Sequence, residues 1–93
     1  MAKPTETLTR RIRIVNELGL HARPAAKIAA LARTARNKIW AIKDDEKVDA
    51  SSIIDILSLA CFKGTELTFQ VEDPSDMVVL DKVVQLINDG FKE

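Results

Sequence analysis

Residues 66–72 alternate strictly between polar and apolar side chains, and this feature constrains the fold more than any other. Leu67, Phe69 and Val71 are apolar, and each is flanked by polar residues. A segment with a period of two forms a β-strand that buries one face and leaves the other in water. One solvent-exposed face is typical of an antiparallel sheet whose opposite face is covered by helices. The segment therefore predicts a sheet with one open face.

Three other segments predict the remaining strands of this sheet. Residues 7–14 alternate in the same way, except that Arg10 stands on the apolar side. Residues 38–43 form a short strand that is apolar on both sides. Residues 47–50 are placed to pair with it as a hairpin across a turn at residues 44–45.

Two helices are marked by the residues that begin and end them. The first opens near His21, with Pro24 in its first turn, where a missing backbone N–H costs nothing. The last begins at Asp73-Pro74, a capping side chain followed by proline, and ends at Gly90. Each carries an apolar stripe for the core: Ile28, Leu31, Ala32 and Ala35 in the first, and Val79, Leu80, Val83, Leu86 and Ile87 in the last, with Phe91 able to fold back.

A third helix, predicted over residues 52–62 and ending before Gly64, carries two apolar stripes. The stripe expected in the core contains Ile53, Ile56, Leu59 and Ala60, and the offset stripe contains Ile54, Leu57 and Cys61. A helix that lies on a single core buries one stripe, so the offset stripe is expected to be partly exposed. Exposed apolar patches usually mark a partner surface. The alternative is a helix buried between its neighbours.

The order of elements is β-α-β-β-α-β-α, and 93 residues allow a single hydrophobic core. With right-handed crossovers and one layer of helices, this order predicts an α+β fold, an open-faced two-layer β-sandwich. Its four-stranded antiparallel sheet has the order 1-4-2-3 and is covered by three helices on one face. The whole chain, 1–93, is expected to be one domain, with residues 1–6 as a loose N-terminus.

Composition argues against several classes of function. Fourteen Lys and Arg residues balance fourteen Asp and Glu residues, whereas nucleic-acid-binding proteins normally carry a basic excess. No apolar run approaches a membrane span, and the first residues lack the apolar core of a secretory signal. We therefore expect a cytoplasmic protein without nucleic-acid binding or membrane insertion. Cys61 has no second Cys or nearby His, and no glycine-rich phosphate loop is present, so we expect no metal and no cofactor.

The single histidine, His21, is placed for phosphoryl chemistry. It follows Gly19 and precedes a helix, where backbone N–H groups have no partners and the helix dipole is positive. Arg23 adds a planar guanidinium suited to phosphate, and Lys27 lies one turn further on the same side. An imidazole is partly neutral, and hence nucleophilic, near neutral pH. The pattern suits reversible phosphorylation of His21; the alternatives are a histidine that caps the helix or one that is simply exposed.

The segment Gly19-Leu-His-Ala-Arg-Pro-Ala25 resembles the active-site signature of the HPr family, the histidine phosphocarriers of the bacterial phosphotransferase system. Residues 52–64 resemble the family's second signature at the expected distance, and the similarity extends from about Thr7 to Phe91. The resemblance implies that His21 receives a phosphoryl group from enzyme I, itself charged by phosphoenolpyruvate, and passes it to an enzyme IIA-type acceptor. The chain would then be a monomeric phosphoryl carrier with a phosphohistidine intermediate, and not an enzyme with a substrate of its own.

The same resemblance implies roles for the residues around His21. Arg23 matches the family arginine that contacts the phosphate. The residues expected to bind the protein partners are Ala22, Lys27, Ile53, Ile54 and Leu57.

Ser52 has two possible roles. It stands before the helix predicted over residues 52–62, with Asp55 three positions later, which predicts a side-chain N-cap. It also matches the family position that a dedicated serine kinase phosphorylates in some bacteria. A serine kinase or phosphatase therefore stays open as a further partner.

The branch of the family also stays open. The family often has glycine where this chain has Asp55 and Ala60, and Asp55 puts a negative charge beside the docking residues. Residues 88–93 are similar to the ending of NPr, the nitrogen-regulatory branch. Sugar transport and a regulatory phosphorelay read by sensor or kinase partners are both compatible with these features. A third hypothesis, an adaptor that has lost transfer, is disfavoured because His21 and Arg23 are present.

Overall fold

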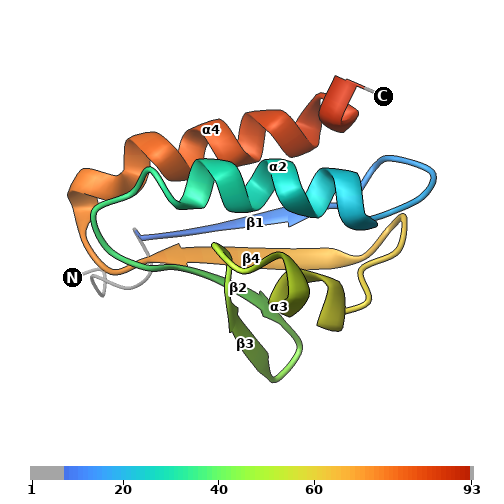
Figure 1. Cartoon of the computed structure of the whole chain (residues 1–93), viewed down its shortest axis with the longest axis horizontal. Helices are drawn as coiled ribbons and strands as arrows, with labels where there is room; N and C mark the ends of the chain where they lie inside the picture. The colour runs from blue at the N-terminus through green and yellow to red at the C-terminus, as the bar shows by residue number, and fades with distance from the viewer. Residues whose placement is uncertain (1–7, 93) are drawn as a thin grey trace.

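Four strands form one antiparallel sheet in the order β1-β4-β2-β3, which confirms the predicted order (Figure 1). The strands are β1 (Thr9–Arg13), β2 (Ile39–Lys43), β3 (Glu46–Asp49) and β4 (Glu66–Val71). β4 lies between β1 and β2, so Leu67 pairs with Ile12 and Phe69 pairs with Ala41. The computed structural model describes residues 8–92, and the loose N-terminus predicted at residues 1–6 lies outside the described residues.

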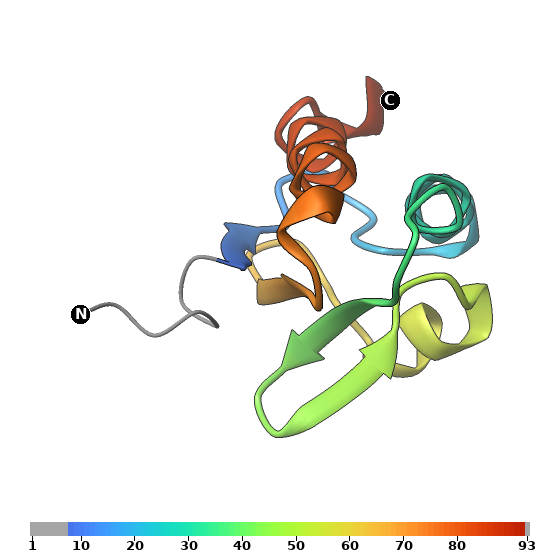
Figure 2. The ribbon, with the colours of Figure 1, turned by 90° about the vertical axis from the view of Figure 1, so that its left-hand side faces the viewer.

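Three α-helices among residues 8–92 cover one face of the sheet, as predicted, and the opposite face is open (Figure 2). They are α2 (Ala22–Ala32), α3 (Ile53–Ser58) and α4 (Met77–Asn88), and α4 is flanked by 3-10 turns at Pro74–Asp76 and Gly90–Lys92. α2 packs against both α3 and α4. Within the described residues, every helix is too short or too polar to cross a membrane.

The period of two in the strands decides which side chains are buried. Arg10, the exception in β1, lies on the covered side, where its Nε is 3.5 Å from Oδ1 of Asp81 on α4. The ion pair explains how a charged residue occupies an otherwise apolar row. Side chains of β4 and of the helices belong to one apolar core, which includes Leu67, Phe69, Val71, Ile28 and Leu80.

α3 is shorter than the predicted helix, which is a correction to the sequence analysis. It ends at Ser58 rather than Phe62, because Ala60 adopts a left-handed backbone conformation with φ of 53°. The ammonium group of Lys43, at the end of β2, donates to the carbonyls of Leu59 (2.8 Å) and Ala60 (3.1 Å). A basic side chain at this point satisfies carbonyls that a helix end leaves unpaired.

The early end of α3 changes the two predicted stripes. Ile56 and Leu59 are buried as predicted, but Ala60 is exposed. Cys61, predicted in the partly exposed stripe, is only 4 % exposed, because the chain leaves the helix before this residue and no longer follows the helical spacing of the stripe. The prediction for Ala60 and Cys61 was therefore wrong.

The two ends of the last helical segment follow the predicted pattern. The carboxylate of Asp73 accepts a hydrogen bond from the backbone N–H of Ser75 (2.8 Å), and Pro74 opens the segment with a 3-10 turn. Gly90 has a φ of 63°, and the chain then folds back so that Phe91 is fully buried.

Candidate functional site

His21 is the N-cap residue of α2, in the position that the sequence predicts. Its backbone is extended, with φ of −78° and ψ of −171°, and its carbonyl accepts the N–H of Ala25 at 3.0 Å. The imidazole makes no hydrogen bond that caps the helix. The alternative of a capping histidine is therefore wrong.

The first turn of α2 offers backbone donors to an anion. In an α-helix the first N–H groups have no acceptor within the helix. Here Pro24 has no N–H and the N–H of Ala25 bonds to His21, so the donors next to the imidazole are those of Ala22 and Arg23. No acidic residue lies in this turn. The positive end of the helix dipole is thus not neutralised locally.

Two basic side chains of α2 lie on the exposed side of this turn. Arg23 is exposed. Lys27 is exposed, and its ammonium group donates to the carbonyl of Phe91 at 3.0 Å. This bond ties the middle of α2 to the end of the described chain, so Lys27 has a structural role beside its predicted role in partner binding.

The loop before His21 is held by a residue that sequence reasoning missed. Asn16 is 8 % exposed, and its Nδ2 donates to the carbonyl of Gly19 at 2.7 Å. Gly19 has a φ of 66°, and a Cβ added to it would lie 2.4 Å from the carbonyl oxygen of Cys61. Glycine is therefore required here for two reasons, its backbone conformation and its close packing. An asparagine three residues before a glycine was the signal available for this turn.

α2 and α3 lie side by side and run in opposite directions (Figure 1). At one end, Nε of Arg33 donates to the carbonyl of Ser51 (3.1 Å). At the other end, the N–H of Leu20 donates to the carbonyl of Cys61 (2.8 Å). The end of α3 therefore lies beside the start of α2, where His21 is.

α3 presents apolar side chains to solvent. Ile54 is 78 % exposed and Leu57 is 38 % exposed, as the two-stripe pattern predicts. Ile53 is half-buried against the core. Asp55, in the first turn of the same helix, is half-buried. We call Ile53, Ile54 and Leu57 the α3 patch.

Ser52 caps α3, which confirms the predicted structural role. Its Oγ accepts the N–H of Asp55 at 3.2 Å. Only half of a capping box is formed, because the N–H of Ser52 donates to the carbonyl of Asp49 (3.1 Å) rather than to the Asp55 side chain.

The remaining reactive side chain close to this site is the Cys61 thiol. Burial raises its pKa above the ordinary value, so it is a poor nucleophile near neutral pH. Within residues 8–92, no three His, Cys, Asp or Glu side chains are grouped as a metal site would require. The chemistry available around His21 is therefore that of its imidazole, the first-turn N–H groups and Arg23.

Comparison with known proteins decides the family. A family model described as the PTS HPr component phosphorylation site matches residues 8–89. The chain belongs to the HPr family. Proteins of this family are phosphoryl carriers of the phosphotransferase system rather than catalytic enzymes, and they interact with enzymes of that system.

Relatives in the HPr family match over almost their whole length. The phosphocarrier protein HPr of Treponema pallidum is 35% identical over 82 residues, which covers 88% of this chain and 93% of that relative. The phosphocarrier protein NPr of Escherichia coli is 33% identical over 89 residues, covering 94% and 98%. The crystal structure of HPr from Thermoanaerobacter tengcongensis superposes with a TM-score of 0.86 at 36% identity, covering 91% and 96%. HPr and NPr relatives match at similar identity, so identity does not separate the two branches.

Proposed function

We propose that this chain accepts a phosphoryl group on His21 from phosphoenolpyruvate-charged enzyme I and donates it to an enzyme IIA-type acceptor. The observation that carries the proposal is the position of His21 as the N-cap of α2, with an imidazole that does not cap the helix. The chain acts as a monomer in the cytoplasm, and its covalent intermediate is a phosphohistidine.

The transfer itself is a displacement at phosphorus. A neutral imidazole nitrogen of His21 forms the new N–P bond while the bond between phosphorus and the donor breaks. The three phosphoryl oxygens then face the N–H groups of Ala22 and Arg23 and the guanidinium of Arg23. The second step is the reverse displacement, in which the acceptor attacks phosphorus and the N–P bond breaks.

Electrostatics favours the phosphorylated state. A negative group at a helix N-terminus gains about 0.3–1 kcal/mol, and about 2 kcal/mol when it is partly buried. A charge-assisted hydrogen bond from Arg23 adds about 1.5–3 kcal/mol. These contributions stabilise phosphohistidine without making it inert, as a carrier requires.

Docking uses the α3 patch together with Ala22 and Lys27. Ile54 and Leu57 are exposed on a helix that packs beside α2, so a partner that reaches His21 covers them too. One small patch serves the donor and the acceptor in turn. Small transient interfaces concentrate their binding energy in a few apolar anchors.

A regulatory phosphorelay of the nitrogen type is the second candidate. It is favoured by the similarity of residues 88–93 to the ending of NPr and by the NPr relatives. In this role the phosphorylation state is read by sensor or kinase partners, with little sugar transport. Phosphorylation of Ser52 by a serine kinase would be a separate control, and it would compete with the capping bond to Asp55.

Labelling the protein with enzyme I and labelled phosphoenolpyruvate tests the proposal. We expect label that is lost in acid and retained in alkali, as phosphohistidine requires. Parallel reactions with enzyme I proteins and acceptors of the sugar and nitrogen branches show which branch turns over faster. No labelling by either donor would identify an adaptor that has lost transfer, and the proposed function would be wrong.

A further inference from the structure

The peptide unit that joins Gly19 to Leu20 is hydrogen-bonded at both of its polar ends. Its carbonyl oxygen accepts a hydrogen bond from Nδ2 of Asn16 at 2.7 Å. Its N–H donates to the carbonyl of Cys61 at 2.8 Å. The C=O and N–H of a trans peptide point in opposite directions, so the two bonds together fix the orientation of its plane. We call these two hydrogen bonds the peptide clamp.

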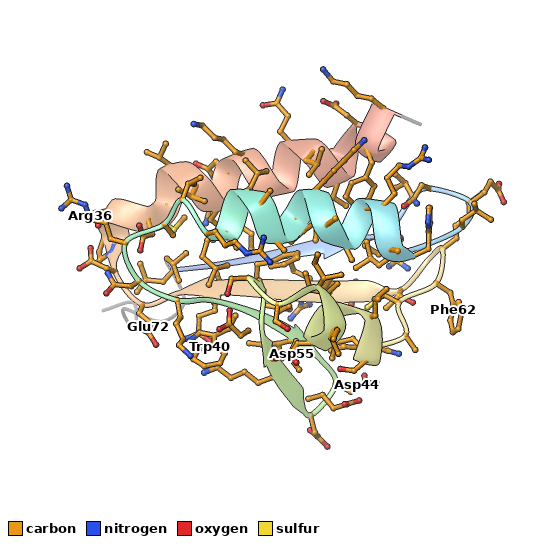
Figure 3. All side chains as sticks on the ribbon, in the orientation of Figure 1. Arg36, Trp40, Asp44, Asp55, Phe62 and Glu72 are labelled. Atoms are coloured by element: carbon orange, nitrogen blue, oxygen red, sulfur yellow. The ribbon has the colours of Figure 1, made fainter. Side chains whose placement is uncertain are left out.

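Both partners of the peptide clamp are themselves held in the fold. The Asn16 side chain is buried, and its backbone carbonyl accepts the N–H of Gly19 at 3.1 Å. Cys61 is buried too. Figure 3 shows the next residue, Phe62, at the end of the molecule where α2 begins. The peptide clamp therefore connects two fixed segments, one on each side of the Gly19–Leu20 peptide.

This peptide needs a restraint because it follows a glycine. A Cβ at residue 19 would lie 2.4 Å from the carbonyl oxygen of Cys61, so the position requires glycine. Glycine also leaves its backbone more conformations than any other residue has. Rotation of the peptide after Gly19 would turn the N–H of Leu20 away from Cys61 and leave a buried carbonyl without its donor. The hydrogen bond from Asn16 opposes that rotation.

The peptide clamp lies directly before the proposed phosphorylation site. Leu20 alone separates it from His21, and the Leu20 side chain is 5 % exposed, so it is anchored in the core. On the other side, the carbonyl of His21 accepts the N–H of Ala25 at 3.0 Å, and α2 begins. The backbone of His21 is therefore fixed from both directions. The direction in which the imidazole projects depends on both restraints.

We propose that Asn16 is a positioning residue for phosphoryl transfer. By holding the Gly19 carbonyl, it keeps the imidazole of His21 in the orientation from which a ring nitrogen attacks phosphorus. The inference rests on the proposed function and extends it to a buried side chain outside the α3 patch. A reacting group displaced by about 1 Å can lose about 10²-fold in rate. Loss of the Asn16 bond should therefore lower kcat and leave docking unchanged.

Transfer kinetics with three substitutions at Asn16 test this role. Asn16→Ala removes the donor, and Asn16→Asp keeps the size of the side chain but offers the Gly19 carbonyl an acceptor instead of a donor. Each protein is titrated against phosphorylated enzyme I, and the KM for the carrier is separated from kcat. We expect both variants to lower kcat about ten-fold or more, with KM within about two-fold of the parental value. Asn16→Ser, whose hydroxyl group can still donate, should recover part of kcat.

A control variant and a spectroscopic measurement separate positioning from a general loss of stability. Val79 is half-buried against the core in the first turn of α4, at the end of that helix far from the start of α2 (Figure 1). Val79→Ala should lower the melting temperature but leave kcat at the parental value. Hydrogen exchange of the Leu20 N–H, followed by NMR, should accelerate more in Asn16→Ala than in Val79→Ala, because only the first variant loses the peptide clamp.

The results that would overturn the inference are distinguishable. If the parent protein accepts no label, the proposed function fails and the role of Asn16 in transfer fails with it. If the parent is labelled and the Asn16 variants keep the parental kcat, the positioning inference alone is wrong. A loss of kcat that Val79→Ala reproduces would show an effect of stability, and a rise in KM alone would show a role in docking; either result would contradict positioning.

Discussion

The backbone N–H of Leu20 donates to the carbonyl oxygen of Cys61 over 2.8 Å, which joins the residue before His21 to the segment that follows α3. Gly19 reinforces this contact, because its missing side chain lets the two backbones approach closely. The proposed phosphorylation site and the proposed docking helix are therefore held as one unit. A partner that binds α3 meets the imidazole at a fixed position.

Replacing Ala60 by glycine should stabilise the protein. Ala60 has a φ of 53°, and the left-handed conformation costs a residue with a Cβ about 1–2 kcal/mol. Glycine avoids this cost of the left-handed conformation. Its greater freedom in the unfolded chain offsets about 0.5–1 kcal/mol of the gain. Ala60→Gly should therefore add about 0.5–1 kcal/mol to the free energy of unfolding, measured in urea. Ala30→Gly, on the exposed side of α2, is the control and should destabilise by about 1 kcal/mol. Equal losses in both variants would contradict this explanation of where α3 ends.

Removing the Arg23 guanidinium should slow transfer without affecting the fold. Its charge-assisted hydrogen bonds to phosphate are worth about 1.5–3 kcal/mol, which corresponds to a loss of roughly ten-fold or more in the transfer rate. Because Arg23 is exposed, the melting temperature of Arg23→Ala should match that of the parent. Stopped-flow or quench-flow transfer measurements check this. Parental rates would show that Arg23 is only a solvated surface charge.

Two glutamate substitutions separate docking from folding. Ile54→Glu places a charge on a side chain that is 78 % exposed, so it should melt like the parent but transfer slowly, because docking would desolvate the charge. Leu59→Glu places a charge at a position that is 1 % exposed, so it should lose several kcal/mol of stability. Melting curves and transfer kinetics on both variants are the measurement. If Ile54→Glu melts normally and also transfers normally, the α3 patch is exposed but unused.

The Cys61 thiol should make stability depend on alkaline pH. Burial raises its pKa in the folded state above the ordinary value of 9.0. The neutral thiol is therefore favoured by folding, and its contribution is complete below about pH 9 and is lost as pH rises through the folded-state pKa. Unfolding in urea at a series of alkaline pH values should show a decline that Cys61→Ala lacks. Iodoacetamide should also modify the folded parent far more slowly than the unfolded chain at neutral pH; equal rates would contradict the burial.

Much of the fold could be predicted because its signals are local. The alternation of Leu67, Phe69 and Val71 set the buried face of β4, and the Asp73-Pro74 pair marked the start of the last helical segment. The length of α3 could not be predicted, because Lys43 of a distant strand binds the carbonyls at its end. The prediction for Cys61 failed with it, because this residue lies beyond the end of α3 and is buried.

The candidate site also has a part that local sequence signals predict and a part that depends on contacts between distant residues. The sequence places His21 at a helix start, since Gly19 and Pro24 bracket it within a few residues. The position of Phe62 beside the His21 loop depends on a bond between Leu20 and Cys61, which are far apart in the sequence. Asn16 was missed because its buried hydrogen bond to Gly19 exists only once the turn has formed.

Labelling of His21→Ala with enzyme I and labelled phosphoenolpyruvate tests the central claim most directly. The parent should take up acid-labile label, and the variant should take up none while its circular dichroism spectrum and melting temperature stay close to the parental values, because an N-cap imidazole without a capping bond contributes little to the core. Undiminished acid-labile labelling of the folded variant would contradict the account, since His21 is the only histidine of the chain.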